Sequence, residues 1–336
     1  MADARRVMLL TDVAMATHRP PGHPERPERL AAVAAGVADG AGAAGVAVER
    51  PPVVAADMDM LQRVHPRSHL DALDDVARRG GGWIDADTYL GPDSMAAARL
   101  AAGASVQAAL AAARGEASVA FAVVRPPGHH AGAERAAGFC LVNNIAVAAL
   151  ALRATGLARR IAILDWDVHH GDGTQDLFDR DPDLCYASTH QMPLYPGTGD
   201  AAERGSGPGL GSKHNVPLPP GSGDEAFVSA WTTLLLPAVE ACRPEAILVS
   251  AGYDAHELDP LAELEVTSLG YRSVGEAIGS LASRLGLPGV ALTLEGGYDL
   301  DALRDSAAAT VEGLLAGLAG ADAASGGATA SGGARA

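Results

Sequence analysis

The sequence predicts an α/β fold in which a parallel sheet carries helices on both faces. Short, continuous apolar runs alternate with longer Ala- and Leu-rich segments along the 336 residues. Such runs are typical of strands that are buried on both faces, and their alternation with helices indicates parallel strands. Residues that carry chemistry follow several of the runs, at the strand ends where sheets of this kind bind ligands.

Five strands are predicted from runs rich in Val, Ile and Leu, namely VMLL (7–10), VAFAVV (119–124), IAIL (161–164), AILVSA (246–251) and VALTL (290–294). Helices are predicted over residues 25–38, 65–79, 93–114, 142–155, 224–241, 266–285 and 300–318. The Gly/Pro-rich stretch 196–223 is flanked by the same alternation. It is therefore interpreted as a long functional loop rather than a linker between domains.

The chain is predicted to form one catalytic domain over residues 1–318. Residues 319–336 are rich in Gly, Ala and Ser, lack large apolar side chains and are predicted to be disordered. The net charge of −16 argues against general nucleic-acid binding, which needs a basic surface, but it is compatible with a basic substrate.

The cysteines and the N-terminal sequence indicate where in the cell the protein is expected. Cys140, Cys185 and Cys242 are scattered without a CxxC pair, so we expect reduced thiols rather than disulfides or a zinc–thiolate site. The N-terminal apolar run VMLL is too short for a signal peptide or a membrane span. We therefore expect a cytoplasmic protein without nucleic-acid or membrane partners.

A metal site is predicted where the strand 161–164 ends, because the sequence continues as DWDVHHGDG (165–173). Asp167 and His169 are two residues apart on an extended backbone, so their side chains point the same way. A DxH pair is short and common, but this strand-end position favours a pair of metal ligands. Asp254, at another strand end, is the candidate third ligand. Two carboxylates and an imidazole suit Zn²⁺ or Fe²⁺ and leave positions open for water and substrate.

Acid–base groups are predicted from the adjacent histidines His129 and His130, because imidazole titrates near neutral pH. Asp165 and Asp172 are candidates for carboxylates that orient the two rings, although vicinal histidines also occur on surface turns. Tyr298 follows two glycines that permit close backbone approach, and its phenol can stabilise an oxyanion; simple packing is the alternative. Together these groups suit hydrolysis of a neutral amide or ester.

Six motifs carry a resemblance to a known family: GHPERPERL (22–30), RPPGHHA (125–131), GFCLVNNIAVAA (138–149), DWDVHHGDGTQ (165–175), SAGYDAHELDP (250–260) and LEGGY (294–298). With them the chain resembles the zinc-dependent histone deacetylase and acetylpolyamine amidohydrolase superfamily, closest to its class II-like bacterial members. The resemblance spans about residues 7 to 316. It implies the arginase/deacetylase fold, a single domain around an eight-stranded parallel sheet.

The resemblance also implies roles for the residues of these motifs. The implied metal ligands, for Zn²⁺ or Fe²⁺, are Asp167, His169 and Asp254. The implied catalytic residues are His130 as general base and acid, His129 as its electrostatic partner, Asp165 and Asp172 behind the pair, and Tyr298 as the oxyanion donor. A structural K⁺ site is implied with side chains of Asp165 and Ser188 and backbone carbonyls of Asp167, His169 and Thr189.

Substrate contacts are implied for Gly138, Phe139, Tyr195, Leu261 and Gly297. Phe139 and Tyr195 would form the aromatic walls of an acyl-lysine tunnel, and Tyr195 departs from the Phe that usually forms the second wall. Polyamine-selective relatives of the class II branch carry a Glu seven residues beyond the third metal ligand. That position is Leu261 here, which favours acyl-lysine.

The expected reaction is removal of an acetyl or other acyl group from a lysine side chain or a small N-acetyl amine. Glu257 and Glu263 lie near Leu261 in the sequence, so an acetylpolyamine amidohydrolase is the first alternative. A catalytically silent acyl-ligand binder is the second, although no metal-ligand or base position is damaged. An arginase-like manganese hydrolase is not expected, because its paired DxHxD motifs are missing. The oligomeric state is left open.

Overall fold

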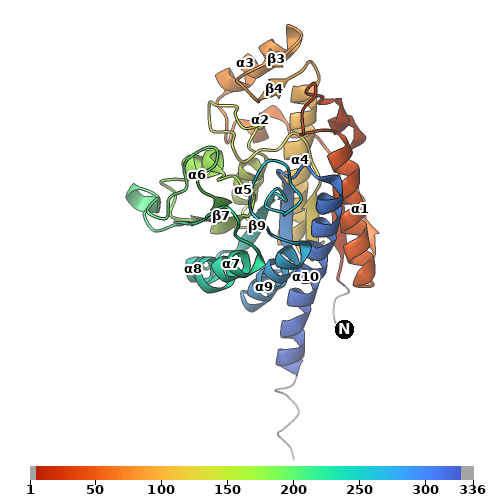
Figure 1. Cartoon of the computed structure of the whole chain (residues 1–336), viewed down its shortest axis with the longest axis vertical. Helices are drawn as coiled ribbons and strands as arrows, with labels where there is room; N and C mark the ends of the chain where they lie inside the picture. The colour runs from red at the N-terminus through yellow and green to blue at the C-terminus, as the bar shows by residue number, and fades with distance from the viewer. Residues whose placement is uncertain (1–4, 327–336) are drawn as a thin grey trace, which may run out of the picture.

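A computed structural model of the chain describes residues 5–326. Its centre is an eight-stranded sheet with the strand order β2-β1-β5-β10-β9-β6-β7-β8. All neighbouring strands in this sheet are parallel, and helices pack around it (Figure 1). The predicted α/β fold with an eight-stranded parallel sheet is confirmed.

The strands of the large sheet are β1 (Val7–Leu10), β2 (Val48–Glu49), β5 (Val119–Ala122), β6 (Ile161–Asp165), β7 (Leu184–Gln191), β8 (Lys213–Leu218), β9 (Ala246–Ala251) and β10 (Val290–Leu294). A separate antiparallel pair consists of β3 (Gly82–Trp83) and β4 (Tyr89–Leu90). All five predicted strands are present. Sequence analysis missed β7 and β8 because LCYASTHQ and KHNVPL mix polar with apolar residues, and it missed β2 because that strand is very short.

The helices are α1 (Glu28–Ala43), α2 (Met58–Leu61), α3 (Arg67–Arg78), α4 (Ser94–Ala113), α5 (Asn144–Ala154), α6 (Asp172–Leu177), α7 (Asp224–Ser229), α8 (Leu236–Cys242), α9 (Ser268–Arg284) and α10 (Leu300–Gly326). Helix α10 packs on α9 and on α1, and α4 packs on α5 and against β5 and β10. The predicted helix 224–241 is divided into α7 and α8 by a π-helical segment, Ala230–Leu235.

Helix α4 is the one helix among residues 5–326 that is long and apolar enough to cross a membrane. Within the protein, however, 72% of its most apolar 18-residue window is buried. Small side chains dominate its buried surface, with Ala97, Ala101 and Ala104 fully inaccessible. These properties are those of a core helix that packs closely against a sheet.

The C-terminal segment differs from its predicted disorder. Helix α10 extends to Gly326, past the predicted domain boundary at residue 318. Alanine has the highest helix propensity, which is consistent with the helix continuing through the Ala-rich sequence after Leu318. Residues 327–336 of the predicted tail lie outside the described residues.

Candidate active site

Four adjacent strands, β5, β10, β9 and β6, end at the same edge of the sheet. The segments that follow them carry, in this order, His129 and His130, Tyr298, Asp254, and Asp167 with His169. Because parallel strands present their carboxyl ends together, residues far apart in sequence meet here. The structure thereby brings together the side chains that sequence analysis selected from separate motifs.

Asp167, His169 and Asp254 form a compact cluster in which the candidate ligand atoms all lie within 4.8 Å of one another. Nδ1 of His169 lies 3.1 Å from Oδ1 of Asp167 and 3.2 Å from Oδ2 of Asp254. Backbone amides hold both carboxylates: Gly296 N–H donates to Asp167 and Val168 N–H donates to Asp254. The cluster is therefore preorganised by the strand ends.

The charges of this cluster fit a divalent cation. Burial opposes protonation of His169, yet hydrogen bonds to Asp167 and Asp254 raise its pKa to about 10. Burial and the neighbouring Asp167 carboxylate raise the pKa of Asp254. Two buried carboxylates at this distance repel each other and strongly favour a positive charge between them. A bound Zn²⁺ or Fe²⁺ would supply that charge, and the donor set is one that these ions accept.

The two histidines have different environments. His130 Nδ1 lies 2.7 Å from Asp172, whereas His129 Nδ1 lies 3.1 Å from Asp165. Burial, then the charge of His129, lowers the pKa of His130 to about 3 even though Asp172 opposes the shift. The pKa of His129 is raised well above its usual value, because nearby carboxylates, Asp167 first, outweigh its burial. At neutral pH the ring of His130 is thus unprotonated.

Tyr298 lines the same pocket as the candidate metal ligands Asp167 and His169, and it is held there through its backbone and its ring. Asp259 accepts a hydrogen bond of 2.6 Å from the Tyr298 amide, and the guanidinium carbon of Arg29 lies 5.1 Å from the centre of the phenol ring. Burial, with the Asp254 carboxylate adding to it, raises the phenol pKa well above its usual value. Tyr298 is therefore a neutral hydrogen-bond donor at physiological pH.

A pocket of about 270 Å³ opens onto these groups. Of the predicted substrate contacts, Gly138, Phe139, Tyr195 and Leu261 line it, but Gly297 does not. Gly296 lines the pocket instead, and the carbonyl of Gly297 accepts a hydrogen bond from Arg29. The rings of Phe139 and Tyr298 meet edge to face, with their centres 5.9 Å apart. The pocket therefore has an aromatic wall directly beside the reactive groups.

The two predicted side-chain ligands of K⁺ lie where β6 and β7 pair. Asp165 is in register with Ser188, and both side chains are fully buried. Asp165 Oδ2 accepts a hydrogen bond of 3.0 Å from the Tyr186 hydroxyl, in addition to its contact with His129. Ser188 Oγ lies 2.9 Å from Nδ1 of His190. The structure thus places the two predicted side-chain ligands side by side, and the K⁺ itself stays a prediction.

Sequence analysis missed a buried ion-pair network behind the site. Arg125 binds Glu25 through two hydrogen bonds of 2.6 and 2.7 Å, and Arg29 donates a third of 3.0 Å. These groups are fully buried, and Arg29 also contacts the segment that carries Tyr298. The GHPERPERL motif, in which Glu25 and Arg29 are four residues apart, was the available signal.

Two further carboxylates were also missed. Glu295 accepts hydrogen bonds from the backbone amides of Gly128 and His129, which fixes the histidine segment; burial raises the Glu295 pKa to about 7. Asp87, from the segment between β3 and β4, lines the pocket. No motif or strand end marks Asp87 in the sequence, so tertiary structure alone brings it to the site.

The comparison with known proteins identifies the family. The family model of the histone deacetylase domain matches residues 23–314. The chain belongs to the histone deacetylase family. A protein named "Probable deacetylase" from Methanothermobacter thermautotrophicus is 47% identical over 264 residues, which cover 77% of this chain and 77% of that protein.

Two other relatives of this histone deacetylase-family protein are informative. A histone deacetylase-like amidohydrolase of Pseudomonas aeruginosa is 38% identical over 245 residues, or 73% of this chain and 64% of that protein. The crystal structure of an acetylpolyamine aminohydrolase from Burkholderia pseudomallei matches with a TM-score of 0.82 and 31% identity, covering 93% of this chain and 99% of that one. The fold is therefore that of the histone deacetylase family, and membership supports hydrolase activity.

His65 links the segment that follows His129 and His130 to the start of α5. Its Nε2 accepts a hydrogen bond of 3.0 Å from the Asn143 amide, so Nδ1 must donate to the carbonyl of Ala133 at 3.1 Å. Protonation of Nε2 would break the first bond. Burial lowers the pKa of this fully buried ring from 6.5 to about 4.

We expect His65 to make the protein less stable in acid. Because its pKa is lower in the folded than in the unfolded state, its contribution is complete above pH 6.5 and is lost as pH falls to about 4. This pKa shift of His65 corresponds to about 3 kcal/mol in the free energy of unfolding. Denaturant unfolding at several pH values should show that the free energy of unfolding falls less steeply in acid for His65→Gln than for wild type. His69→Gln, which changes a less buried neighbouring ring, is the control; an unchanged dependence in His65→Gln would contradict the prediction.

Proposed function

We propose that this protein is a metal-dependent amidohydrolase that removes the acetyl group from acetyl-lysine or a related N-acetyl amine. The observation that carries the proposal is the convergence of three features on one pocket. These are the buried cluster of Asp167, His169 and Asp254, the neutral His130 and the neutral phenol of Tyr298. Family membership supports the reaction class.

Asp167, His169 and Asp254 would hold Zn²⁺, with Fe²⁺ as the alternative ion. A divalent ion bound there supplies polarisation of the acyl carbonyl and lowers the pKa of a bound water. The protein's own contribution is to fix the two carboxylates through backbone amides and to surround them with a buried environment. Electrostatic interactions are stronger in such a site than in water.

His130 would act as general base and then as general acid. Asp172 holds Nδ1 of its ring, which leaves Nε2 to receive a proton from the attacking water. As the C–N bond of the amide breaks, His130 returns this proton to the departing amine. His129 would stabilise the developing negative charge, because its raised pKa keeps it protonated.

Tyr298 would donate a hydrogen bond to the carbonyl oxygen as it gains negative charge. Phe139 and Tyr195 would hold the methylene chain of the substrate between them, as aromatic rings suit an apolar stem. The ring centres of Tyr195 and His130 are 5.1 Å apart, which brings this wall next to the base. A structural K⁺ held by Asp165 and Ser188 would brace the loop behind His129 and is proposed on the same family resemblance.

The pocket favours acyl-lysine over acetylpolyamine. Leu261 is an apolar lining residue, whereas Glu257 and Glu263 are exposed and are not among the residues that line the pocket. Besides Asp167 of the candidate metal site, the carboxylate of Asp87 lines it, and Asp87 could attract an ammonium group. This acidic side chain and the similarity to the acetylpolyamine aminohydrolase keep that activity as the second candidate.

Substitution of Leu261 by glutamate is expected to shift substrate preference. A carboxylate at this position would pair with the distal ammonium of an acetylpolyamine, and a partly exposed ion pair is worth about 1 kcal/mol. We expect kcat/KM for N-acetylputrescine to rise about fivefold relative to an acetyl-lysine peptide. Leu261→Gln is the matched control because it adds the same shape without charge. If both variants changed the ratio of the two kcat/KM values equally, an electrostatic cause of the altered substrate preference would be excluded.

The decisive experiment is hydrolysis of a fluorogenic acetyl-lysine peptide by Zn²⁺-reconstituted protein, with and without a hydroxamate chelator. We expect turnover that the hydroxamate abolishes, and a higher kcat/KM than for N-acetylputrescine. Higher kcat/KM for the polyamine would favour the second candidate. Tight hydroxamate binding without hydrolysis of any amide would contradict the proposal and favour a silent acyl-ligand binder.

A further inference from the structure

A second cluster of potential metal ligands lies at the opposite end of the sheet from the pocket. Cys185 is the second residue of β7, His214 is the second residue of β8, and Cys242 is the last residue of α8. Because both strands are parallel and begin here, the cluster lies at their amino ends, whereas the active site lies at the carboxyl ends. The two clusters share no residue.

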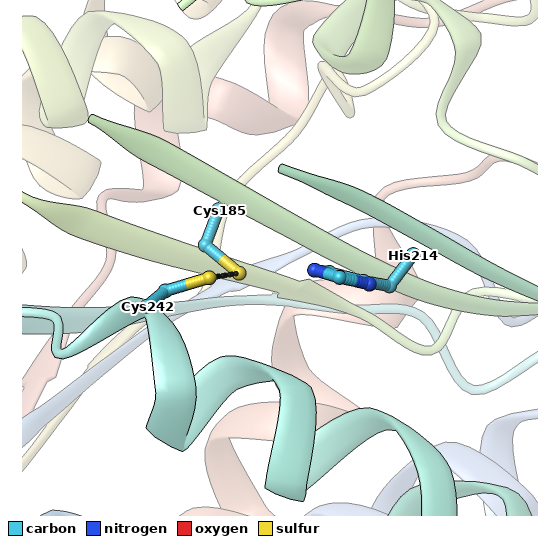
Figure 2. Close-up of side chains that lie close together, drawn as sticks. All are labelled: Cys185, His214 and Cys242. Carbon is cyan, nitrogen blue, oxygen red and sulfur yellow. Dashed lines mark hydrogen bonds between the residues drawn. The ribbon is translucent and has the colours of Figure 1, made fainter. Parts of the chain in front are cut away.

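The sheet register explains why these side chains meet. His214 pairs with Ala187 across β7 and β8, and Cys185 is two residues before Ala187. Side chains two residues apart on a strand point to the same face, so Cys185 and His214 share a face. Helix α8 packs on β7 and delivers Cys242 to that face. Figure 2 shows the imidazole of His214 directed toward the two sulfur atoms.

The side chains of Cys185, His214 and Cys242 lie close together. The sulfur atoms of Cys185 and Cys242 lie 2.8 Å apart, and all three candidate ligand atoms lie within 4.8 Å of one another. Nε2 of His214 is buried and has no hydrogen-bond partner among the described residues. A buried polar atom without a partner destabilises the fold, and a ligand bound to this nitrogen would remove that cost.

Two cysteine sulfur atoms this close together can form a disulfide or bind one metal ion. The sulfur separation of 2.8 Å lies between about 2.05 Å for a disulfide and about 3.8 Å for two thiolates on one tetrahedral ion with bonds of about 2.3 Å. The histidine decides between them. A disulfide would leave Nε2 of His214 unsatisfied, whereas a metal ion would bind all three groups.

We propose that Cys185, His214 and Cys242 form a second metal site for a thiolate-binding divalent cation such as Zn²⁺. Two thiolates and an imidazole are a donor set that Zn²⁺ prefers, and a water molecule can complete the tetrahedron. Both thiols give up their protons to solvent when the ion binds.

The bound ion would tie together two strands at one edge of the sheet and the end of a helix. Between Cys185 and His214 the chain passes through the long loop that carries Tyr195, so the ion would anchor both ends of the segment that forms one pocket wall. The role is structural and rests on neither the catalytic ion nor the substrate. It differs from the expectation from sequence, which excluded a zinc–thiolate site because no CxxC pair is present.

Cobalt(II) titration of reduced, metal-free, full-length protein tests the proposal. Thiolate ligation produces sulfur-to-cobalt charge-transfer absorption, which a site with only oxygen and nitrogen donors cannot produce. We expect two equivalents of Co²⁺ to bind, with the charge-transfer band belonging to one of them. Asp254→Asn should lose one equivalent and keep the band, so failure of the catalytic site would be distinguishable from failure of this site.

Substitutions assign the band to its ligands. Cys242→Ser and Cys185→Ser should abolish it, and His214→Ala should weaken Co²⁺ binding at this site at least tenfold. Cys140→Ser, at the third cysteine, should leave the band unchanged. Zn²⁺ should raise the melting temperature of Asp254→Asn, and adding Cys242→Ser should remove that increase.

Two outcomes would overturn the metal site. One is the absence of sulfur-to-cobalt absorption in the reduced wild-type protein. The other is a band that persists in both cysteine variants. If the reduced protein binds no thiophilic metal and air oxidation removes two titratable thiols in wild type but none in Cys242→Ser, Cys185 and Cys242 are a redox pair instead.

Discussion

Replacing Asp254 by asparagine is expected to remove the catalytic metal and the activity together. The substitution keeps the size of the side chain but removes one of the two carboxylates that balance the ion's charge. Because a bound metal supplies several kcal/mol of transition-state stabilisation, kcat/KM should fall at least about 10³-fold. Metal analysis of the purified protein and hydrolysis of an acetyl-lysine peptide measure the two effects separately.

Asp172→Asn is the matched control for this prediction. Asp172 contacts His130 and Arg135 and does not belong to the ligand cluster. This variant should keep its metal and lose activity, because the ring of His130 is no longer oriented and its basicity changes. If Asp254→Asn retained a full equivalent of catalytic metal, the proposed ligand set would be wrong.

The sequence predicts much of this site because its residues follow strands that are easy to recognise. The five continuous apolar runs all form strands, and parallel strands bring their carboxyl ends to one edge. Short motifs after those runs, such as the one that carries Asp167 and His169, therefore converge without any knowledge of distances. The physical basis is the fixed direction of a parallel sheet.

Sequence analysis missed elements whose polar side chains are buried in the folded protein. Strand β7 is entirely buried although it contains Ser188, Thr189 and His190. These groups are satisfied by tertiary hydrogen bonds, such as the one that Trp231 donates to the Thr189 hydroxyl. Hydrophobic patterning cannot identify a strand of this kind, because its polar side chains look exposed until their partners are known.

The supporting carboxylates were missed for the same reason. Glu25 and Glu295 are fully buried, yet each is an ordinary surface residue by composition. Burial opposes ionisation of Glu25, but its hydrogen bond with His18, and then the charges of Arg125 and Arg29, hold its pKa well below the usual range. Backbone amides bind Glu295. Some of these partners come from segments a hundred or more residues away, such as Arg125 for Glu25, and no local pattern reveals such distant partners.

Replacing Tyr298 by phenylalanine is expected to lower kcat about 10²–10³-fold, because one oxyanion donor is worth that much. Metal content should stay at the wild-type level, since the hydroxyl is not in the ligand cluster. KM for an acetyl-lysine peptide should change little, because the ring still packs against Phe139 and under Arg29. Steady-state kinetics with metal analysis separate these effects.

Tyr195→Phe distinguishes a specific role of the Tyr298 hydroxyl from a general need for a pocket phenol. Both tyrosines line the pocket, but Tyr195 is 42% exposed and lies on the side of His130. Loss of its hydroxyl should change kcat less than about threefold, because a partly solvated group gains little between ground state and transition state. Equal losses in the two variants, or full activity in Tyr298→Phe, would contradict the oxyanion role, because only a donor aimed at the developing charge produces a defect confined to kcat.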